Sequence, residues 1–322
     1  MAELLDFEEP IAELVKELDL LTAQPRTDSN VRSIEALSRR INDKRAEIYR
    51  SLTPWQQVLV ARHPGRPSLE VFLARLFVGF VEIHGDRRFA DDHAIITGFA
   101  EYRGQQVLVL GHVKGGGDTK EKIFRNFGYA RPEGYRKALR AMRMAEKFRR
   151  PIIVFVDTPA AYPGIESEER GVAEAIAVNL RDMMLLDTPI IVIVSGEGGS
   201  GGALGIAVGD AVLMQEHAIY SVIPPEGCAA ILWRDPSRKV EAAEALKLTA
   251  PDLLKAGIID GIIPEPVGGA HADPDATLAL LDGVLDEVLR GVSALESEVR
   301  LTRRYEKFRN MGRLGVDFVD EG

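Results

Sequence analysis

The 322-residue chain contains a single cysteine, Cys228. One cysteine can neither close an internal disulfide nor build a cysteine-based zinc site, and we expect Cys228 to be a buried structural thiol. Long hydrophobic runs are also missing, since the stretches Pro151–Val156 and Ile190–Val194 fall far short of the ~20 residues that a membrane span needs. The acidic N-terminal sequence has no secretory pattern. These absences predict a cytoplasmic protein that does not enter a membrane.

Positive charge is scarce as well. Forty basic residues oppose 49 acidic residues, for a net charge of −9, so nucleic acid is not expected as a main partner. Two local features run against this trend. The glycine-rich loop Lys114–Lys120 lacks the Gly-Lys-Ser/Thr ending of a phosphate loop, so it either lines an anionic ligand or is solvated. The basic stretch Lys120–Arg140 is either a solvated helix face or a docking site for an acidic partner or a phosphorylated ligand.

The first 55 residues differ in pattern from the rest of the chain. Apolar residues at helical spacing follow Pro10, a polar loop spans Gln24–Asn30, and a second helical stripe follows that loop. Two helices joined by a turn form a hairpin whose apolar stripe must pack on the main domain or on another subunit. We therefore predict a helical hairpin extension at 1–55 and a main domain at 56–322.

The main domain has the alternating pattern of an α/β fold. Two apolar runs rich in β-branched residues, PIIVFVD and TPIIVIVS, are typical of strands buried on both faces. Helical segments between the strands imply right-handed crossovers and a mostly parallel sheet. The expected strands are Ala94–Tyr102, Gln106–His112, Pro151–Asp157, Thr188–Ser195, Val212–Gln215, Ala218–Ile223 and Ile258–Ile263. The expected helices are Pro132–Arg150, Glu168–Leu186, Gly201–Val208 and Asp275–Leu295.

Glycine is concentrated after the two buried strands, in Asp157–Gly164 and in Ser195–Gly202. Parallel sheets bind ligands at the carboxyl ends of their strands, where these loops lie. The second loop runs straight into a predicted helix, whose first amides have no partner within the helix. Such a turn can stabilise an oxygen that becomes negative during a reaction.

Three interpretations compete for the second glycine loop. Its spacing Gly196-x-Gly198-x-x-Gly201 fits a dinucleotide fingerprint, with Glu216 as the downstream acid, although at least three strands precede it. Alternatively, Ser200 fits a nucleophile elbow.

For that second interpretation, His217 or His271 would be the base, but neither lies in a convincing triad context. The third interpretation is a backbone oxyanion hole without a side-chain nucleophile. Only this one accounts for the surplus of glycine, since we expect tight packing alone not to need six glycines between Ser195 and Gly205.

Longer collinear motifs resemble one family. They run from an LDFEEPIAEL start to about Arg303, and the sequence is similar to the carboxyltransferase α subunit of bacterial multi-subunit acetyl-CoA carboxylase. The motifs are GDRRFADDHAI, GHVKGGGDTKEKIFRNFG, PEGYRKALR, VDTPAAYPG, EERGVAEAIAVNL, GEGGSGGALGIAVGD, YSVIPPEGCAAILW and IIPEPVGGAH.

The resemblance implies a crotonase-like (ClpP/crotonase) fold of repeated ββα units with the helical hairpin as an extension. It implies transfer of a carboxyl group from carboxybiotin, held on a biotin carboxyl carrier protein, to acetyl-CoA, giving malonyl-CoA for fatty acid synthesis. The expected partners are a β subunit in an α2β2 assembly, the carrier protein and biotin carboxylase. Zinc is expected only on the β subunit, which carries a cysteine-based ribbon, and no metal is expected on this chain.

The resemblance also implies roles for particular residues. The backbone amides of Gly201 and Gly202 are expected to stabilise the biotin-derived oxyanion, while the corresponding hole for the thioester lies on the β subunit. Ala160 stands where family members usually have glycine, and its methyl group would hinder a backbone with positive φ. The expected lining of the carboxybiotin pocket comprises Gly198, Gly199, Ala160, Ala161, Tyr162 and Gly164.

Two alternatives remain open. The chain could be a crotonase-fold acyl-CoA hydratase or a serine-type hydrolase that uses Ser200. It could also be a structural subunit that shapes the complex without catalytic groups of its own.

Overall fold

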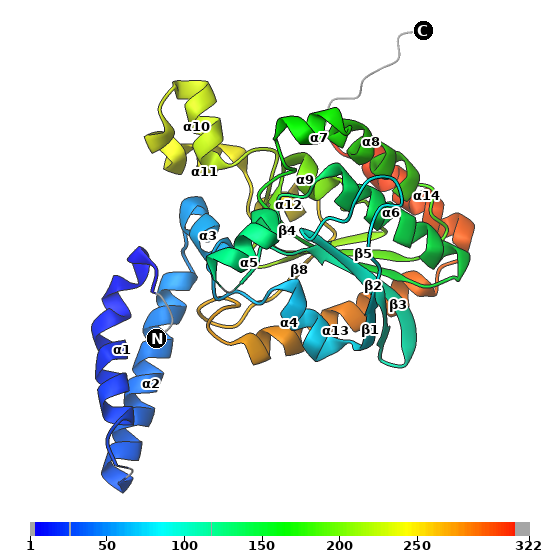
Figure 1. The fold of residues 1–322 in the computed structure, drawn as a ribbon. Coiled ribbons are helices and arrows are strands. Elements are labelled where there is room, and N and C mark those ends of the chain that lie inside the picture. Colours follow the sequence, from blue (N-terminus) through cyan, green and yellow to red (C-terminus); the bar gives the residue numbers. More distant parts are fainter. Residues whose placement is uncertain (1–3, 26, 117, 313–322) are drawn as a thin grey trace.

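A single sheet organises the computed structural model, which describes residues 4–25, 27–116 and 118–312. Its strand order is β1-β2-β3-β4-β5-β6-β8, and β7 pairs with the end of β5 (Figure 1). The pairs β1–β2 and β2–β3 are antiparallel, whereas all the other pairs are parallel. The strands are β1 Val78–Glu82, β2 Ile95–Tyr102, β3 Gln105–His112, β4 Ile152–Thr158, β5 Ile190–Gly199, β6 Ala211–Gln215, β7 Ile219–Ser221 and β8 Gly261–Ile263.

Both faces of the sheet are covered, which explains the continuous apolar runs in the sequence. Along β4, Ile152 and Val154 belong to one core cluster and Ile153 and Phe155 to the other, because successive side chains point to opposite faces. The first face packs against α6 (Pro132–Lys147), α8 (Val172–Met183), α9 (Ser200–Leu204), α12 (Ala250–Lys255) and α14 (Ser297–Asn310). The second face packs against α4 (Leu69–Leu76) and α13 (Pro274–Ser293).

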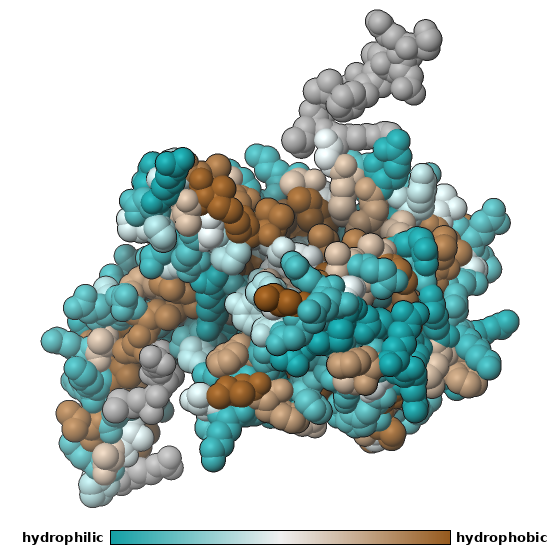
Figure 2. Space-filling view, turned by 45° about the horizontal axis from the view of Figure 1, so that its top comes forward, coloured by the Kyte–Doolittle hydropathy of each residue, from teal (hydrophilic) through white to brown (hydrophobic). Residues whose placement is uncertain are grey.

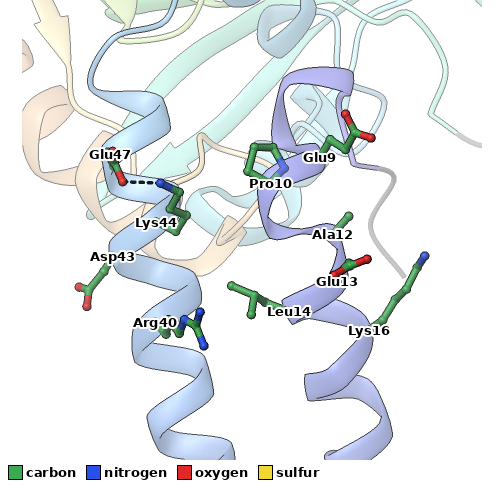
Figure 3. Close-up of a pocket in the computed structure, with 10 residues that line it drawn as sticks. All are labelled: Glu9, Pro10, Ala12, Glu13, Leu14, Lys16, Arg40, Asp43, Lys44 and Glu47. Atoms are coloured by element: carbon green, nitrogen blue, oxygen red, sulfur yellow. Dashed lines mark hydrogen bonds and ion pairs between the residues drawn. The ribbon is translucent and has the colours of Figure 1, made fainter.

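The N-terminal residues form a helical hairpin, α1 (Glu9–Thr22) and α2 (Asp28–Tyr49), which projects from the body in Figure 1. Thr27 caps α2 through the amide of Asn30, whose side chain donates to the carbonyl of Leu21 at 3.0 Å and so fixes the turn. Between the two helices lies an open cavity of about 770 Å³, walled by acidic and basic side chains (Figure 3). The division of the chain at residue 55 stays a prediction.

Shorter helices connect these elements. They are η1 (Asp6–Glu8), α3 (Pro54–Ala61), α5 (Thr119–Phe124), η2 (Asn126–Gly128), α7 (Ile165–Glu169), α10 (Pro225–Trp233), η3 (Pro236–Arg238) and α11 (Lys239–Leu246). Helices α10 and α11 form a small lobe beside the body (Figure 1). Within the described ranges, no helix combines the length and apolar character that crossing a membrane requires.

The order of the predicted elements is confirmed, but three details are wrong. The helix expected over Glu168–Leu186 is broken, because Gly171 adopts φ +77° between α7 and α8. The strand expected to stop at Ser195 continues as β5 to Gly199, and the helix expected to reach Val208 ends at Leu204. Within the predicted loop Lys114–Lys120, Gly117 lies outside the described residues.

Candidate active site

The glycine turn between β5 and α9 lies at the carboxyl end of the parallel strands. Here Ser200 has φ +51°, a left-handed conformation that is uncommon for a residue with a side chain. That single residue turns the chain sharply from the strand into the helix. The amides of Gly201 and Gly202, in the first turn of α9, donate no hydrogen bond to any other described residue.

A second loop, Pro159–Gly164, packs directly against this turn. A Cβ placed on Gly202 would lie 2.4 Å from the carbonyl carbon of Ala160 and 2.4 Å from the amide nitrogen of Ala161. Thr158 supports the loop, since its hydroxyl donates to the carbonyls of Gly128 at 2.7 Å and Ala160 at 2.9 Å. The two glycine-rich loops that the sequence singled out are therefore neighbours.

Buried side chains hold the turn from the side of the sheet's first face. The hydroxyl of Tyr135 donates to the carbonyl of Gly202 at 3.4 Å. The side-chain amide of Asn179 donates to the carbonyl of Gly205 at 2.8 Å and to that of Tyr135 at 3.0 Å. Helix α9 is thus fixed by α6 and α8 while its first amides stay free of internal partners.

A charged cluster lies at the same edge of the sheet. The ammonium group of Lys114, just after β3, is 2.6 Å from Asp157 of β4 and 3.3 Å from Glu197 of β5. Burial lowers the pKa of Lys114, but the carboxylates of Asp157 and Glu197 outweigh it and raise that pKa overall. Arg62 binds Glu197 at 2.8 Å and Glu226 at 2.7 Å, which connects the strands to α3 and α10.

His112, the last residue of β3, is the most unusual side chain in this region. It is 1% exposed, and neither ring nitrogen has a hydrogen-bond partner among the described residues. Burial, together with the positive charge of Lys114, lowers the pKa of His112 to about 3, although the backbone of Gly202 has a smaller effect that raises this pKa. The ring is therefore neutral at pH 7. It lines a cavity of about 250 Å³ together with Arg62, Lys114, Lys122 and Asp157.

Comparison with known proteins identifies the family. A family model described as acetyl co-enzyme A carboxylase carboxyltransferase-like matches residues 4–312. The chain belongs to this family. A carboxyl transferase subunit alpha of acetyl-coenzyme A carboxylase from Geobacter metallireducens is 54% identical over 310 residues, which cover 96% of this chain and 97% of the relative. The corresponding subunit alpha from Oceanobacillus iheyensis is 50% identical over 315 residues, covering 97% of this chain and 99% of the relative.

Solved structures confirm the crotonase-like carboxyltransferase fold. A Pseudomonas malonate decarboxylase hetero-tetramer in complex with coenzyme A matches 67% of this chain and 86% of its own, with a TM-score of 0.55 and 18% identity. Transcarboxylase 12S matches 68% of this chain and 41% of its own, with a TM-score of 0.53 and 19% identity. At these identities the likeness concerns the fold.

Most of the glycines between Ser195 and Gly205 are needed because neighbouring atoms leave no space for a side chain. Our expectation that close packing alone would not need these glycines is therefore wrong. A Cβ on Gly199 would lie 1.8 Å from the carbonyl oxygen of Pro159, and one on Gly198 would lie 2.8 Å from the ring of Tyr220. Both residues are buried in β5, where Gly198 pairs with β4 and both pair with β7. Gly201 differs, because its nearest neighbour would be Ile176 at 3.6 Å, an ordinary contact.

The other predicted pocket residues lie in the loop after β4. Ala160, Ala161, Tyr162 and Gly164 are all partly exposed, and Tyr162 stacks under the guanidinium of Arg131 at 5.0 Å. Ala160 is not among the residues with positive φ, so its methyl group causes no backbone strain. Cys228 is buried, as predicted.

The histidines proposed as bases for Ser200 serve elsewhere. His217 packs edge-on against Tyr49 with ring centroids 5.6 Å apart, and His271 stacks on His63 at 3.7 Å. The site residues that the sequence analysis did not single out are His112, Asp157 and Glu197, whereas Lys114 begins the loop that was predicted either to line an anionic ligand or to be solvated. All four lie at the end of a predicted strand or within two residues of it, and that position was the available signal.

Proposed function

We propose that this chain is the α component of a carboxyltransferase that moves a carboxyl group from carboxybiotin to acetyl-CoA, forming malonyl-CoA. Its family and the names of its relatives support this reaction. The observation that carries the mechanism is the pair of adjacent amides, those of Gly201 and Gly202, that have no partner within the described chain. We also infer a cytoplasmic location, in keeping with the single cysteine.

The two amides supply what carboxyl transfer requires. Carboxybiotin, presented by its carrier protein, provides the carboxyl group, and its departure leaves negative charge on the ureido oxygen. Fixed N–H donors stabilise such charge without any titrating side chain, and losing one donor costs about 10²–10³ in rate in oxyanion-hole enzymes. Tyr135 and Asn179 keep α9 in place, so the donors need no rearrangement during the reaction.

The surroundings of the turn fit a bicyclic, partly apolar ring. A cavity of about 270 Å³ begins at Ser200 and has mainly apolar walls, formed by Leu204, Tyr220, Val222 and residues of α11 and α12. Ala160 and Ala161 close the other side of the turn. Gly198 and Gly199, in contrast, contribute by allowing the close packing beneath it.

A β subunit completes the site in this proposal. Large apolar side chains are exposed near the turn, including Leu204 at 42% and Val222 at 74%, and Ile231 and Leu232 on α10 are 71% and 63% exposed. Figure 2 shows apolar surface extending along the body beside the α10 lobe. We assign the zinc site to the β subunit, because the single cysteine of this chain cannot build a cysteine-based ribbon. The complex is proposed to be α2β2 and to act with the biotin carrier protein and biotin carboxylase.

The decisive test uses Gly201, because this position has room for a side chain. Gly201→Pro removes one amide, and we expect kcat for malonyl-CoA-dependent carboxylation of free biotin to fall about 10²–10³-fold in the co-expressed αβ complex. Gly201→Ala keeps the amide and meets only Ile176 at 3.6 Å, so it is the steric control, with at most a few-fold loss. Near-normal turnover of an intact Gly201→Pro complex would eliminate the oxyanion role.

The strained backbone of Ser200 favours one competing function, a serine-type hydrolase, because a nucleophile elbow places its serine in a similar turn. The two histidines considered as its base pack elsewhere, His217 against Tyr49 and His271 against His63. Ser200→Ala separates the two functions. Retained carboxyl transfer supports the backbone mechanism, whereas complete loss with normal assembly supports a nucleophilic serine.

A further inference from the structure

A cavity rich in arginine lies on the outer side of α6 and α8. It measures about 540 Å³, and the loop after β1 closes one of its walls. Two carboxylates, Asp86 and Glu174, contribute to its lining. The arginines that line it are Arg87, Arg88, Arg136, Arg140, Arg143 and Arg181. Such a concentration of positive charge is unexpected in a chain whose net charge is −9.

Half of these arginines have carboxylate partners. Arg136 binds Asp86 at 2.8 Å and also Glu133, 3.0 Å away. Arg143 and Arg181 share a single carboxylate, that of Asp182. These pairs neutralise part of the charge of the three guanidinium groups, of which only that of Arg136 is largely buried.

The other half have none. Arg140 donates to the carbonyls of His84 and Gly85, at 2.9 to 3.2 Å, which orders its guanidinium group without neutralising it. Arg87 and Arg88 are exposed, and their side chains form no ion pair within the described chain. The cavity therefore retains positive charge that its own carboxylates do not balance.

A buried polar group also lacks a partner here. Asn179 lines the cavity and is 1% exposed. Its side-chain nitrogen donates to the carbonyls of Tyr135 and Gly205, which fixes the orientation of the amide. Its Oδ1 then accepts no hydrogen bond from any described residue. A buried acceptor in this state is costly, and a donor from a molecule bound in the cavity would satisfy it.

We propose that this cavity binds a phosphorylated small molecule that also carries hydroxyl groups, such as a nucleotide or a sugar phosphate. Guanidinium groups bind phosphate oxygens bidentately, and a ligand hydroxyl supplies the donor that Asn179 lacks. The volume suits a molecule of this size, whereas an acidic protein surface would leave a concave site of this kind largely unfilled. The proposal is independent of the proposed function, because Gly201 and Gly202 do not line this cavity.

Calorimetric titration of the intact αβ complex tests the proposal. The probes are ADP, ribose 5-phosphate, CoA and inorganic pyrophosphate, each at low and high salt. We expect ADP or ribose 5-phosphate to bind more tightly than pyrophosphate, with an affinity that falls as salt rises. The comparison of ADP with ribose 5-phosphate distinguishes a nucleotide from a sugar phosphate, and CoA reports whether the substrate itself is the source of the phosphate.

The double variant Arg87→Gln/Arg88→Gln removes two guanidinium groups that form no ion pair within the described chain. We expect it to weaken binding at least tenfold while carboxyl transfer stays unchanged, which shows that the complex is intact. Arg32→Gln, at an exposed position on α2, is the matched control and should bind as the wild type does. The proposal is overturned if none of the probes binds, or if the double variant binds them as tightly as the wild type does. Pyrophosphate binding as tightly as ADP would overturn the role of Asn179.

Discussion

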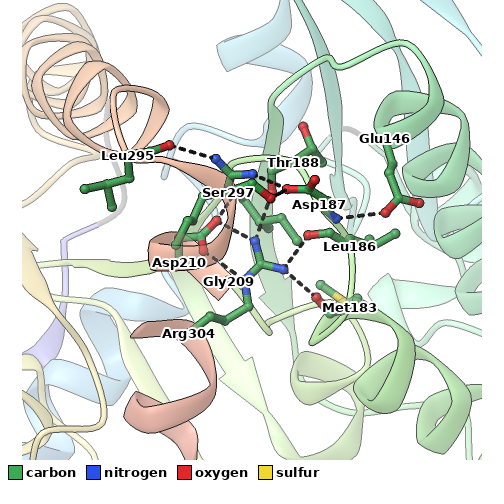
Figure 4. A network of polar contacts seen from close by, with 12 residues as sticks. Glu146, Met183, Leu186, Asp187, Thr188, Gly209, Asp210, Leu295, Ser297 and Arg304 are labelled. Carbon is green, nitrogen blue, oxygen red and sulfur yellow. Dashed lines mark hydrogen bonds and ion pairs between the residues drawn. The ribbon is translucent and has the colours of Figure 1, made fainter. Parts of the chain in front are cut away.

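The two ends of the parallel strands treat buried polar groups in opposite ways. At the amino ends, Arg304 of α14 is fully buried and uses every donor of its guanidinium group (Figure 4). It binds Asp210 at 2.7 and 2.9 Å and donates to the carbonyls of Met183, Leu186 and Thr188 at 2.8 to 2.9 Å.

At the carboxyl ends, Lys114 and the carboxylates of Asp157 and Glu197 are paired, but some polar groups beside them are left without partners. The ring of His112 has none, and the amides of Gly201 and Gly202 have none within the described chain. Unsatisfied buried groups are costly, so a protein keeps them where binding or catalysis needs them. The amino ends of the strands thus contribute stability, and the carboxyl ends contribute the proposed activity.

We expect the largest effect when the hydrogen-bond network of Arg304 is broken. Arg304→Met would leave the carboxylate of Asp210, which is 4% exposed, without its counter-charge, and three carbonyls without a donor. We expect a loss of about 3–5 kcal/mol in the free energy of unfolding, measured with urea. The adjacent exposed Arg303→Met is the control and should change stability by less than about 0.5 kcal/mol. Equal effects of the two variants would contradict the structural role of Arg304.

The next effect compares neighbouring glycines of the turn. Gly202→Ala places a Cβ 2.4 Å from the backbone of Ala160 and Ala161, so one loop must move. We expect it to cost about 1–3 kcal/mol in the free energy of unfolding and to reduce kcat, since the amide is displaced. Gly201→Ala should be close to neutral in unfolding measurements. A stable and active Gly202→Ala complex would mean that the two loops are not packed as described.

A third prediction concerns acid. The folded pKa of His112, about 3, lies below its ordinary value, so the unfolded chain binds an extra proton as the pH falls below about 6.5. The stability that His112 contributes is therefore present at pH 8 and lost progressively on acidification. The expected loss at pH 5 is about 2 kcal/mol.

His112→Leu isolates this contribution, because the neighbouring titratable groups remain. Its stability should fall less steeply between pH 8 and pH 5 than that of the wild type, because leucine cannot take up the proton that the unfolded chain binds at His112. Urea unfolding curves across this range provide the measurement. Identical pH profiles would show that His112 is not buried in its neutral form.

The sequence was sufficient for the elements that depend on local pattern. The run PIIVFVD predicts β4 because alternate residues must fill two cores. The sequence could not predict that β5 continues to Gly199, because this continuation depends on pairing with β7, which lies farther along the chain, and with the end of β4. Helix α14 was missed for a similar reason. Its Arg304 can be buried because it donates hydrogen bonds to the carbonyls of Met183 and Thr188, which are far away in the sequence.

The candidate site shows the same limit. Gly201 and Gly202 were predicted from the family resemblance together with a glycine turn before a helix, which is a local feature, and their role stays a prediction. The loop that begins at Lys114 was predicted either to line an anionic ligand or to be solvated. The surroundings of His112 and the pairing of Lys114 with Asp157 and Glu197 could not be predicted, since they come from three strands and from α3.

The smallest expected effect concerns the contact that joins the core to the turn. Tyr135→Phe removes a 3.4 Å hydrogen bond to the carbonyl of Gly202, which is long for a hydroxyl donor, and leaves the ring packing unchanged. We expect a loss of less than about 1 kcal/mol in the free energy of unfolding and roughly a threefold decrease in kcat, with KM unchanged.

The matched control is Tyr102→Phe, which removes a 2.7 Å hydrogen bond to Asp282 on the second face of the sheet. It should lower the free energy of unfolding by as much or more, while kcat stays constant. Because both variants lose one buried hydroxyl, a lower kcat in Tyr135→Phe alone would show that this bond orients the turn. Equal kcat values would confine Tyr135 to packing.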